Sequence, residues 1–321
     1  MKYVRPKIII SKCLEFDACR YDGQMINNDY IRLMKAYIDF LTVCPEVEIG
    51  MGIPRDTIHL VEQKGKSMLI QSKTNKDYAP KMVEFSDNYL SNTTEIDGFI
   101  LKSRSPSCGI SSTKIYPKTT KNTSPLRKGS GLFASKVIDY FPNHPKEEDK
   151  RLNDIFLREH FLTSIFTIAE FRSVKSFKDL YNFQGKHKYL FMTYNQIKMR
   201  QMGKIAANFD NHSFRYVKKN YMNLLYKLFS KRPRYLSNIN TQMHIFGYFK
   251  KKLSADEKVY FLELLEKYRN GIIPISGVNI VLKAWSVRIN NKYLINQSYF
   301  QPFPKELVIL NESRMKKMQI I

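Results

Sequence analysis

Four cysteines, all within the first 108 of 321 residues, carry the most reactive side chains of this chain. Thiolates bind soft metals and attack electrophiles. Cys13, Cys44 and Cys108 each lie in a short segment with Ser, Pro or Gly nearby, whereas cysteines that only fill a core usually lie within apolar runs. The residues therefore indicate a metal site, with three inert buried thiols as the simpler alternative.

Two kinds of metal site fit these cysteines. With a fourth ligand such as His59 or Cys19, the thiolates would complete a tetrahedral zinc site. Three thiolates alone would bind an iron–sulfur cluster and leave one iron without a protein ligand. The residue types by themselves leave both sites open.

Two of the cysteines come after predicted strands. Lys7–Ser11 reads KIIIS and predicts a short buried strand before Cys13, and Gly98–Leu101 predicts another before the Cys108 loop. Repeated strand, loop and helix patterns predict an α/β domain with a mostly parallel sheet. Ligands of such sheets gather at the carboxyl ends of strands.

The third cysteine follows a segment with helical periodicity. Ile26–Val43 places apolar residues on one helical face and ends at Cys44-Pro45. We therefore expect a helix over this whole segment.

The chain changes character near residue 142. The polar segment from Asp139 to Arg151 contains two prolines and predicts a linker or domain edge. Beyond it, apolar residues three or four apart predict helices at Leu152–Phe171, Tyr216–Phe229 and Glu257–Tyr268. We expect an α/β domain at 1–142 and an all-α domain at 143–321.

The charge indicates a polyanionic partner. The net charge is +24, of which +6 belongs to residues 1–142 and +18 to residues 143–321. Nucleic acid is the favoured partner, with a membrane surface or mere solubility as alternatives. The expected RNA contacts are Lys186, Lys188, Lys198, Arg200 and Lys204, which have tyrosines nearby that would stack on unpaired bases.

The ends and apolar runs of the chain predict a cytoplasmic location. Residues 1–10 lack the apolar stretch and cleavage site of a signal peptide, and no apolar run approaches the ~20 residues of a membrane span. In a reducing compartment, thiols and metal ligands are expected rather than disulfides.

Three ordered motifs surround the cysteines. They are Cys13-Leu14 with Arg20-Tyr21-Asp22-Gly23, Cys44-Pro45-Glu46 with Pro54-Arg55 downstream, and Ser105-Pro106-Ser107-Cys108-Gly109. Together they resemble the TudS family of thiouracil desulfidases over residues 5–140. The resemblance implies a Rossmann-like domain whose 4Fe-4S cluster is held by Cys13, Cys44 and Cys108, without Cys19.

Later motifs extend the resemblance. They are Phe141-Pro142, Glu147-Glu148, Arg151-Leu152-Asn153-Asp154, His187-Lys188-Tyr189-Leu190 and the segment Gln301–Leu307. These motifs are similar to those of the YbgA-type helical domain. A TudS-like domain fused to a YbgA-like domain is the RudS-type architecture, which implies removal of sulfur from 4-thiouridine in tRNA.

The resemblance also implies a mechanism. The open iron would bind the thiocarbonyl sulfur, and water would attack the base carbon without net electron transfer. Glu46, two residues from Cys44, is the predicted general acid/base. The resemblance adds Ser105, whose Ser-Pro-Ser setting is also ordinary turn chemistry. The candidates for orienting the substrate are Arg20, Tyr21, Asp22 and Asp77, although Tyr-Asp-Gly also favours a turn.

Other interpretations stay open. One alternative is an enzyme that desulfurates free thiouracil and does not need the second domain for its chemistry. Another is a non-catalytic protein that binds RNA and senses redox state through its cluster. Gly129–Ala134 fits a glycine loop that opens a helix, but the surrounding pattern disfavours a dinucleotide site. Phosphate capture at that helix start is the remaining interpretation of this motif.

Overall fold

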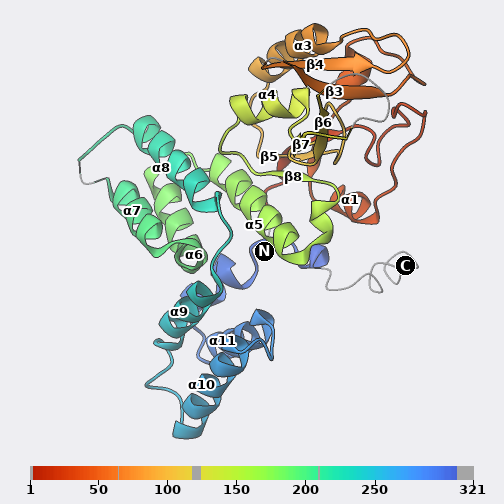
Figure 1. Ribbon diagram of the computed structural model, residues 1–321. Helices are drawn as coiled ribbons and strands as arrows, with labels where there is room; N and C mark the ends of the chain where they lie inside the picture. Colours follow the sequence, from red (N-terminus) through yellow and green to blue (C-terminus); the bar gives the residue numbers. More distant parts are fainter. Residues whose placement is uncertain (1–2, 64, 118–123, 209, 309–321) are drawn as a thin grey trace. The chain divides into compact units, whose positions relative to one another are not determined.

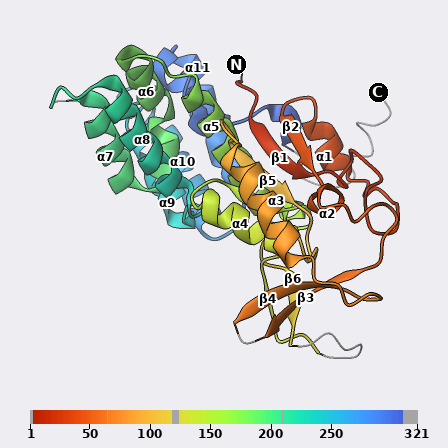
Figure 2. The same cartoon turned by 90° about the horizontal axis from the view of Figure 1, so that it is seen from above.

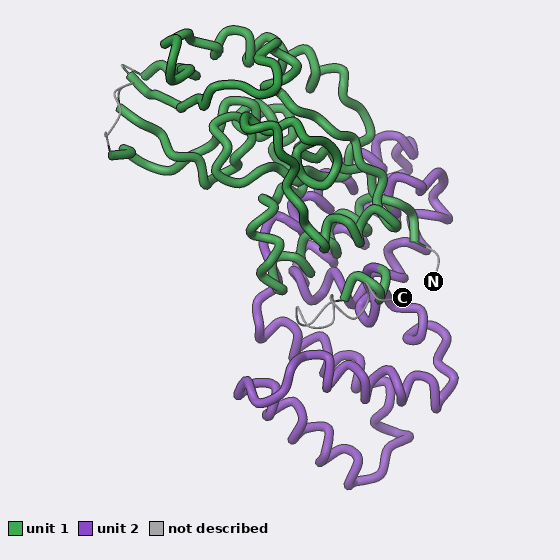
Figure 3. The backbone as a smooth tube through the Cα atoms, turned by 90° about the vertical axis from the view of Figure 1, so that its right-hand side faces the viewer, with its two compact units in different colours: residues 1–169, 304–321 green, residues 170–303 purple. Residues whose placement is uncertain are grey.

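The computed structural model describes residues 3–63, 65–117, 124–208 and 210–308 (Figure 1). Two compact units divide the chain. Unit 1 comprises Met1–Ala169 and Pro304–Ile321, and unit 2 comprises Glu170–Phe303 (Figure 3). All the strands of the described residues belong to unit 1.

The first sheet of unit 1 is parallel throughout. Its strands are β1 (Lys7–Ser11), β2 (Asp39–Val43), β5 (Gly98–Leu101) and β8 (Lys146–Glu148), in the order β2-β1-β5-β8. The isoleucines of β1 are fully buried, as expected for a strand covered on both faces. The predicted strands at 7–11 and 98–101 and the predicted mostly parallel sheet are confirmed.

The helix expected over residues 26–43 is wrong in its second half. Helix α1 covers only Asp29–Met34, where the Asn28 side chain accepts from the first amides. The chain then continues as β2, which pairs in register with β1 from Lys7 opposite Asp39 to Ser11 opposite Val43. Phe-Leu-Thr-Val favours a strand, so sheet pairing overrides the helical periodicity.

A second, mixed sheet has no counterpart among the predictions. It contains β3 (Ile58–Gln63), β4 (Lys66–Gln71), β6 (Thr113–Tyr116) and β7 (Arg127–Gly129), in the order β4-β3-β6-β7. Figure 2 shows the β3–β4 hairpin set apart from the parallel strands. Besides α1, this unit contains the helices α2 (Pro45–Glu48), α3 (Ala79–Ser91) and α4 (Leu132–Tyr140) and most of α5. Side chains from both sheets, α3 and α4 form one hydrophobic core.

Of the two interpretations of residues 139–151, a linker or a domain edge, the linker is wrong because the segment contains edge strand β8. Glu148 and Asp149 are buried, yet their carboxylates accept main-chain hydrogen bonds, including one from Ser103 N to Asp149 at 2.7 Å. Bonded carboxylates make a polar sequence compatible with a buried strand. The compact units do not follow the boundary at residue 142, and the division into functional domains stays a prediction.

The rest of the described chain is helical. The elements are η1 (Arg151–Asn153), α5 (Ile155–Arg172), α6 (Phe177–Tyr194), α7 (Gln196–Ala207), α8 (Phe214–Phe229), α9 (Tyr235–Phe246), α10 (Ala255–Arg269), α11 (Ile275–Arg288), α12 (Lys292–Ile295), η2 (Ser298–Phe300) and η3 (Lys305–Leu307). The three predicted helices correspond to α5, α8 and α10. Among the helices that the structure describes, none has the length and apolarity to cross a membrane.

Candidate active site at the ends of three parallel strands

The three predicted ligand cysteines follow three neighbouring strands. Cys13 comes two residues after β1, Cys44 comes directly after β2, and Cys108 lies in the loop that follows β5. Because these strands are parallel and adjacent in the order β2-β1-β5, their carboxyl ends share one edge of the sheet. The sheet therefore carries all three thiols to the same region.

The thiols of this region influence one another's ionisation. Burial raises the pKa of Cys13 to about 12, and the nearby Cys44 adds to that effect. Burial also raises the pKa of Cys108, with smaller contributions from Cys13 and Cys44. The proximity that the strand order implies is therefore reflected in the electrostatics of the thiols.

Cys44 is the thiol that ionises most readily. A hydrogen bond from the Cys19 thiol lowers the pKa of Cys44 to about 7, although burial opposes it. The same interaction raises the pKa of Cys19, which is buried. The fourth cysteine thus lies directly beside a predicted ligand.

The described residues contain no ready-made site for a single metal ion. No group of three or more His, Cys, Asp or Glu side chains among the described residues is placed to hold one metal ion. Zinc requires its ligands around one point at about 2.3 Å, whereas each cysteine of a cluster binds a different iron and needs no such crowding. His59 lies in β3 of the other sheet, with Nε2 2.8 Å from the Ser72 hydroxyl. The described residues therefore do not support the zinc alternative.

Glu46 lies in the first turn of α2, next to this edge of the sheet. Its Oε2 accepts from Arg55 Nη2 at 2.7 Å and Nε at 2.9 Å. Its Oε1 accepts from the Ser107 hydroxyl at 2.9 Å. Sequence reasoning did not assign Arg55 or Ser107 a role, although both lie within the motifs around the cysteines. The structure brings the predicted acid/base to the residue next to Cys108.

Ser105 shapes the turn before Cys108. Its hydroxyl oxygen accepts from the amides of Ser107 and Cys108 at 3.2 and 3.1 Å. Its carbonyl oxygen accepts from Gly109 N at 2.9 Å. These hydrogen bonds stabilise a turn, which is the alternative role that the Ser-Pro-Ser sequence suggested for Ser105. The catalytic role of Ser105 stays a prediction.

The loop of Arg20, Tyr21 and Asp22 is held by its own side chains. Arg20 pairs with Asp22 at 3.2 Å, and Gly23 N donates to the Arg20 carbonyl at 3.0 Å. The Tyr21 ring is exposed. The loop adjoins the site through its main chain, because Arg55 N donates to the Tyr21 carbonyl at 2.8 Å.

Asp77 lies between β4 and α3. Its Oδ1 accepts from Leu69 N at 2.9 Å and Ala79 N at 2.8 Å. These contacts fix the start of α3 against β4. Substrate binding by Asp77 stays a prediction.

The start of α4 holds the Cys108 loop. Leu132 N and Ala134 N donate to the carbonyls of Pro106 and Ser107 at 3.1 and 3.0 Å. A Cβ on Gly131 would lie 2.6 Å from the Ser107 main chain, so the close approach requires glycine. These two amides are therefore already bonded to the Cys108 loop, and phosphate capture at this helix start stays a prediction.

The predicted RNA contacts lie on α6 and α7 of unit 2. Lys186 pairs with both oxygens of Glu170 at 2.7 and 2.8 Å, and Lys198 donates to the Lys227 carbonyl at 2.6 Å. The Lys188 ammonium lies 5.9 Å from the Tyr189 ring centroid. Arg200 and Lys204 are exposed.

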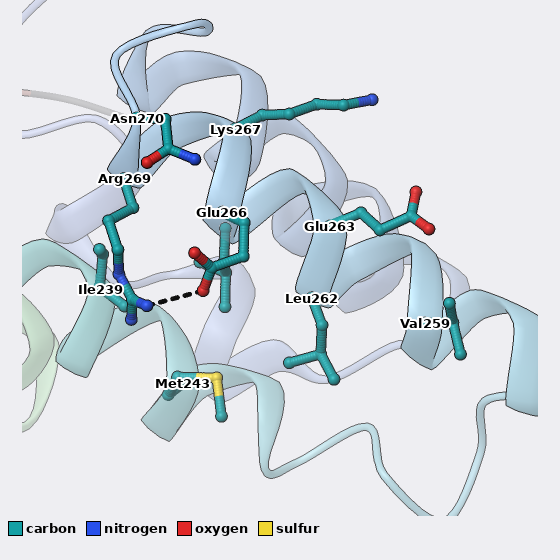
Figure 4. A pocket seen from close by; sticks show the side chains of 10 residues that line it. Ile239, Met243, Val259, Leu262, Glu263, Glu266, Lys267, Arg269 and Asn270 are labelled. Carbon is teal, nitrogen blue, oxygen red and sulfur yellow. Dashed lines mark hydrogen bonds and ion pairs between the residues drawn. The ribbon is translucent and has the colours of Figure 1, made fainter.

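Unit 2 also contains an apolar groove of about 700 Å³ between α9 and α10 (Figure 4). Ile239, Met243 and Leu262 line it, and the Glu266–Arg269 ion pair borders it. The cysteines and Glu46 belong to unit 1. None of the residues that line this groove is a predicted site residue.

Two family models match separate regions of the chain. The family model described as 2-thiouracil desulfurase matches residues 8–149, and the model described as a protein of unknown function (DUF1722) matches residues 188–304.

Two curated relatives each match a part of the chain. The Escherichia coli (strain K12) protein YbgA is 23% identical over 151 residues, which are 45% of this chain and 88% of YbgA. The Bacillus subtilis (strain 168) protein YbbK is 29% identical over 109 residues, which are 32% of this chain and 72% of YbbK. A solved [4Fe-4S]-dependent thiouracil desulfidase, TudS, is 24% identical with a TM-score of 0.38, covering 47% of this chain and 95% of that one. The chain thus matches the 2-thiouracil desulfurase model in one region and the DUF1722 model in another, and part of it is similar to YbgA.

Proposed function

We propose that the chain is a cytoplasmic desulfidase that uses a 4Fe-4S cluster to convert 4-thiouridine in tRNA to uridine. The observation that carries the proposal is the convergence of three cysteines at the ends of adjacent parallel strands, with the Glu46 carboxylate beside them. The match of residues 8–149 to the 2-thiouracil desulfurase model supports the same chemistry.

Cys13, Cys44 and Cys108 would hold the cluster. When bound, the cluster supplies one iron without a protein ligand, which acts as a Lewis acid toward a soft sulfur atom. Cys44 and Cys108 are buried and Cys13 is partly buried, which would limit the access of bulk water to the cluster.

Glu46 would move the protons. Hydrolysis of a thiocarbonyl consumes one water, forms a carbonyl and releases hydrogen sulfide, so electrons balance without an oxidant or reductant. The Glu46 carboxylate takes a proton from the attacking water and returns it to the departing sulfur. Its place in the first turn of α2, two residues after Cys44, supports this role.

The basic composition of unit 2 supports tRNA as the partner. Residues 170–303 contain 24 Lys and Arg but only 7 Asp and Glu, and residues 180–255 contain 15 basic residues and one acidic residue, Asp210. A helical surface of this charge attracts phosphates, and binding would weaken steeply with salt. We propose that tRNA binding involves the residues Lys188, Lys198, Arg200 and Lys204.

A second candidate is desulfuration of a free thiolated base. It is favoured by the match to the 2-thiouracil desulfurase model, which ends at residue 149 and includes no part of unit 2. After anaerobic reconstitution of the cluster, kcat/KM should be compared for 2-thiouracil, for 4-thiouridine and for 4-thiouridine-containing tRNA. A higher value for tRNA supports the first proposal, and a higher value for the free base supports the second.

The acid/base assignment has its own test. Glu46→Gln should keep the cluster's visible absorption but lose turnover by about 10² to 10⁴, the usual contribution of general acid–base catalysis. A Glu46→Gln protein that desulfurates at the wild-type rate would remove Glu46 from the mechanism. A reconstituted wild-type protein that binds tRNA but desulfurates no thiolated base would favour a non-catalytic, redox-sensing RNA-binding protein.

A further inference from the structure

The Glu46 carboxylate is held from two sides by different segments of unit 1. Arg55, nine residues further along the chain, binds Oε2 with two nitrogens at 2.7 and 2.9 Å. Ser107, from the loop after β5, binds Oε1 at 2.9 Å. We call Arg55, Glu46 and Ser107 the Glu46 clamp.

Arg55 is almost completely buried, with a side chain 4% exposed. Its third nitrogen, Nη1, donates to the carbonyls of Cys19 and Gly52 at 3.0 and 3.1 Å. Burying a guanidinium is costly unless all its donors are bonded and a carboxylate neutralises it. The Glu46 pair and these two carbonyls meet that requirement, so the arginine fits this place closely.

Ser107 is fully buried, and its main chain is fixed on both sides. Its amide donates to the Ser105 hydroxyl, and its carbonyl accepts from Ala134 N of α4. The hydroxyl is thereby aimed at Glu46. Ser105 supports the turn, and Ser107 is the serine whose hydroxyl touches the proposed acid/base.

The clamp has a consequence for proton transfer. A carboxylate bonded to Arg55 through one oxygen and to Ser107 through the other has one orientation. Positioned acid/base groups lose activity when they shift, and a displacement of ~1 Å costs about 10²-fold in rate. The Glu46 side chain is 13% exposed. Without its contacts to Arg55 and Ser107, its carboxylate would be free to rotate.

We propose that Arg55 and Ser107 are positioning residues that fix the orientation of the Glu46 carboxylate for desulfuration. This inference rests on the proposed function. Neither residue is assigned to touch the substrate, so their loss should lower kcat far more than it changes KM.

The first test is kinetic. Arg55→Ala should lower kcat about 100-fold, and guanidinium ion, at concentrations well below those that unfold proteins, should restore part of it by occupying the vacated site. Arg55→Lys should have a lower kcat than Arg55→Ala supplied with guanidinium ion, because lysine lacks the planar, forked donor group of arginine. Ser107→Ala should lower kcat about 10-fold. The matched control is Arg127→Ala, which breaks another Arg–Glu pair of unit 1, with Glu62 at 2.6 Å, and should keep wild-type kcat.

The second test needs no activity. In the cluster-free protein, urea midpoints of Arg55→Ala, Glu46→Ala and the double variant form a double-mutant cycle. Each single variant leaves a buried charge without its partner, so the double variant should be more stable than the sum of the two losses predicts. Additive losses would show that the two side chains are not coupled.

The outcomes separate the two levels of the proposal. If wild-type protein with a full cluster desulfurates no thiolated base, the proposed function fails and the catalytic role of the clamp fails with it, whatever the cycle shows. If the wild type turns over but Arg55→Ala and Ser107→Ala keep its kcat with a full cluster, only the positioning role is overturned. A further combination of results would also overturn the positioning role. In it, guanidinium ion does not restore the kcat of Arg55→Ala, and the stability losses of the Arg55 and Glu46 variants are additive.

Discussion

Glu148 Oε1 accepts a hydrogen bond from the main-chain amide of Ile110 at 2.7 Å. The same oxygen also accepts from Ser111 N at 2.9 Å and Ser112 N at 3.1 Å. Glu148 ends β8 and is buried, and the three amides begin two residues after Cys108. A carboxylate of the edge strand therefore holds the loop that presents Cys108.

Replacing this carboxylate should destabilise the protein. Glu148→Ala leaves three amides without their acceptor and should lower the free energy of unfolding by about 3 kcal/mol, while Glu148→Gln, which keeps one oxygen, should cost less. The measurement is urea unfolding of the cluster-free protein. Glu147→Gln is the matched control, because its partner Arg151 is half exposed and such pairs contribute under about 1 kcal/mol. Equal losses for Glu147 and Glu148 would contradict this role.

His144 should make unit 1 sensitive to acid. Burial lowers its pKa to about 4 from 6.5, with the Lys146 cation contributing. Above pH 6.5 the ring is neutral in both folded and unfolded chains. Between pH 6.5 and 4 only the unfolded chain gains a proton there, so stability falls as the pH falls, by about 3 kcal/mol in total.

The variant His144→Gln should remove that part of the pH dependence. Urea unfolding at pH 7 and pH 4.5 gives the loss for each protein, and other titrating groups cancel in the difference between them. An equal loss in wild type and variant would show that His144 does not titrate in this way.

The cysteines should differ in their effect on iron content. Cys13→Ala, Cys44→Ala and Cys108→Ala should each lose most of the cluster on anaerobic reconstitution, because three protein ligands cannot become two without exposing further iron. Cys19→Ala should bind iron close to the wild-type amount, since Cys19 lies beside Cys44 but is not a predicted ligand. Iron analysis and visible absorption measure both. Loss of iron from Cys19→Ala as complete as from Cys44→Ala would make Cys19 a ligand.

The exposed basic residues should control RNA binding through salt. Arg200→Ala and Lys204→Ala should each weaken tRNA binding and reduce the slope of log K against log salt by about 1. Lys186→Ala should change that slope less, because Glu170 already neutralises its charge. Fluorescence anisotropy over a salt series measures all three. Identical slopes for wild type and Arg200→Ala would exclude that residue from the interface.

The sequence predicted the strands and helices that depend mainly on interactions between residues close together in the chain. The bounds of β1 and β5 match the predicted strands because each is a short run of apolar residues with one stable conformation. The short motifs marked Cys13, Cys44 and Cys108 as candidate ligands because Ser, Pro or Gly lies near each of them, and their role as ligands stays a prediction. The helices at α5, α8 and α10 followed from apolar periodicity.

Long-range interactions account for what the sequence did not predict. Strand β2 forms because β1, some thirty residues away, supplies its hydrogen-bond partners. Strand β8 is polar, and only the amides that bind Glu148 and Asp149 make its burial possible. The contacts of Glu46 with Arg55 and Ser107 likewise join segments that nothing in the spacing connects.

The most direct test of the central claim is nucleoside analysis of tRNA. Transfer RNA that contains 4-thiouridine is incubated anaerobically with the reconstituted protein, digested and quantified by mass spectrometry. The account predicts loss of 4-thiouridine with an equal gain of uridine, in the wild type and in Cys19→Ala but not in Cys44→Ala. Unchanged 4-thiouridine after incubation with wild-type protein that carries a full cluster would contradict it.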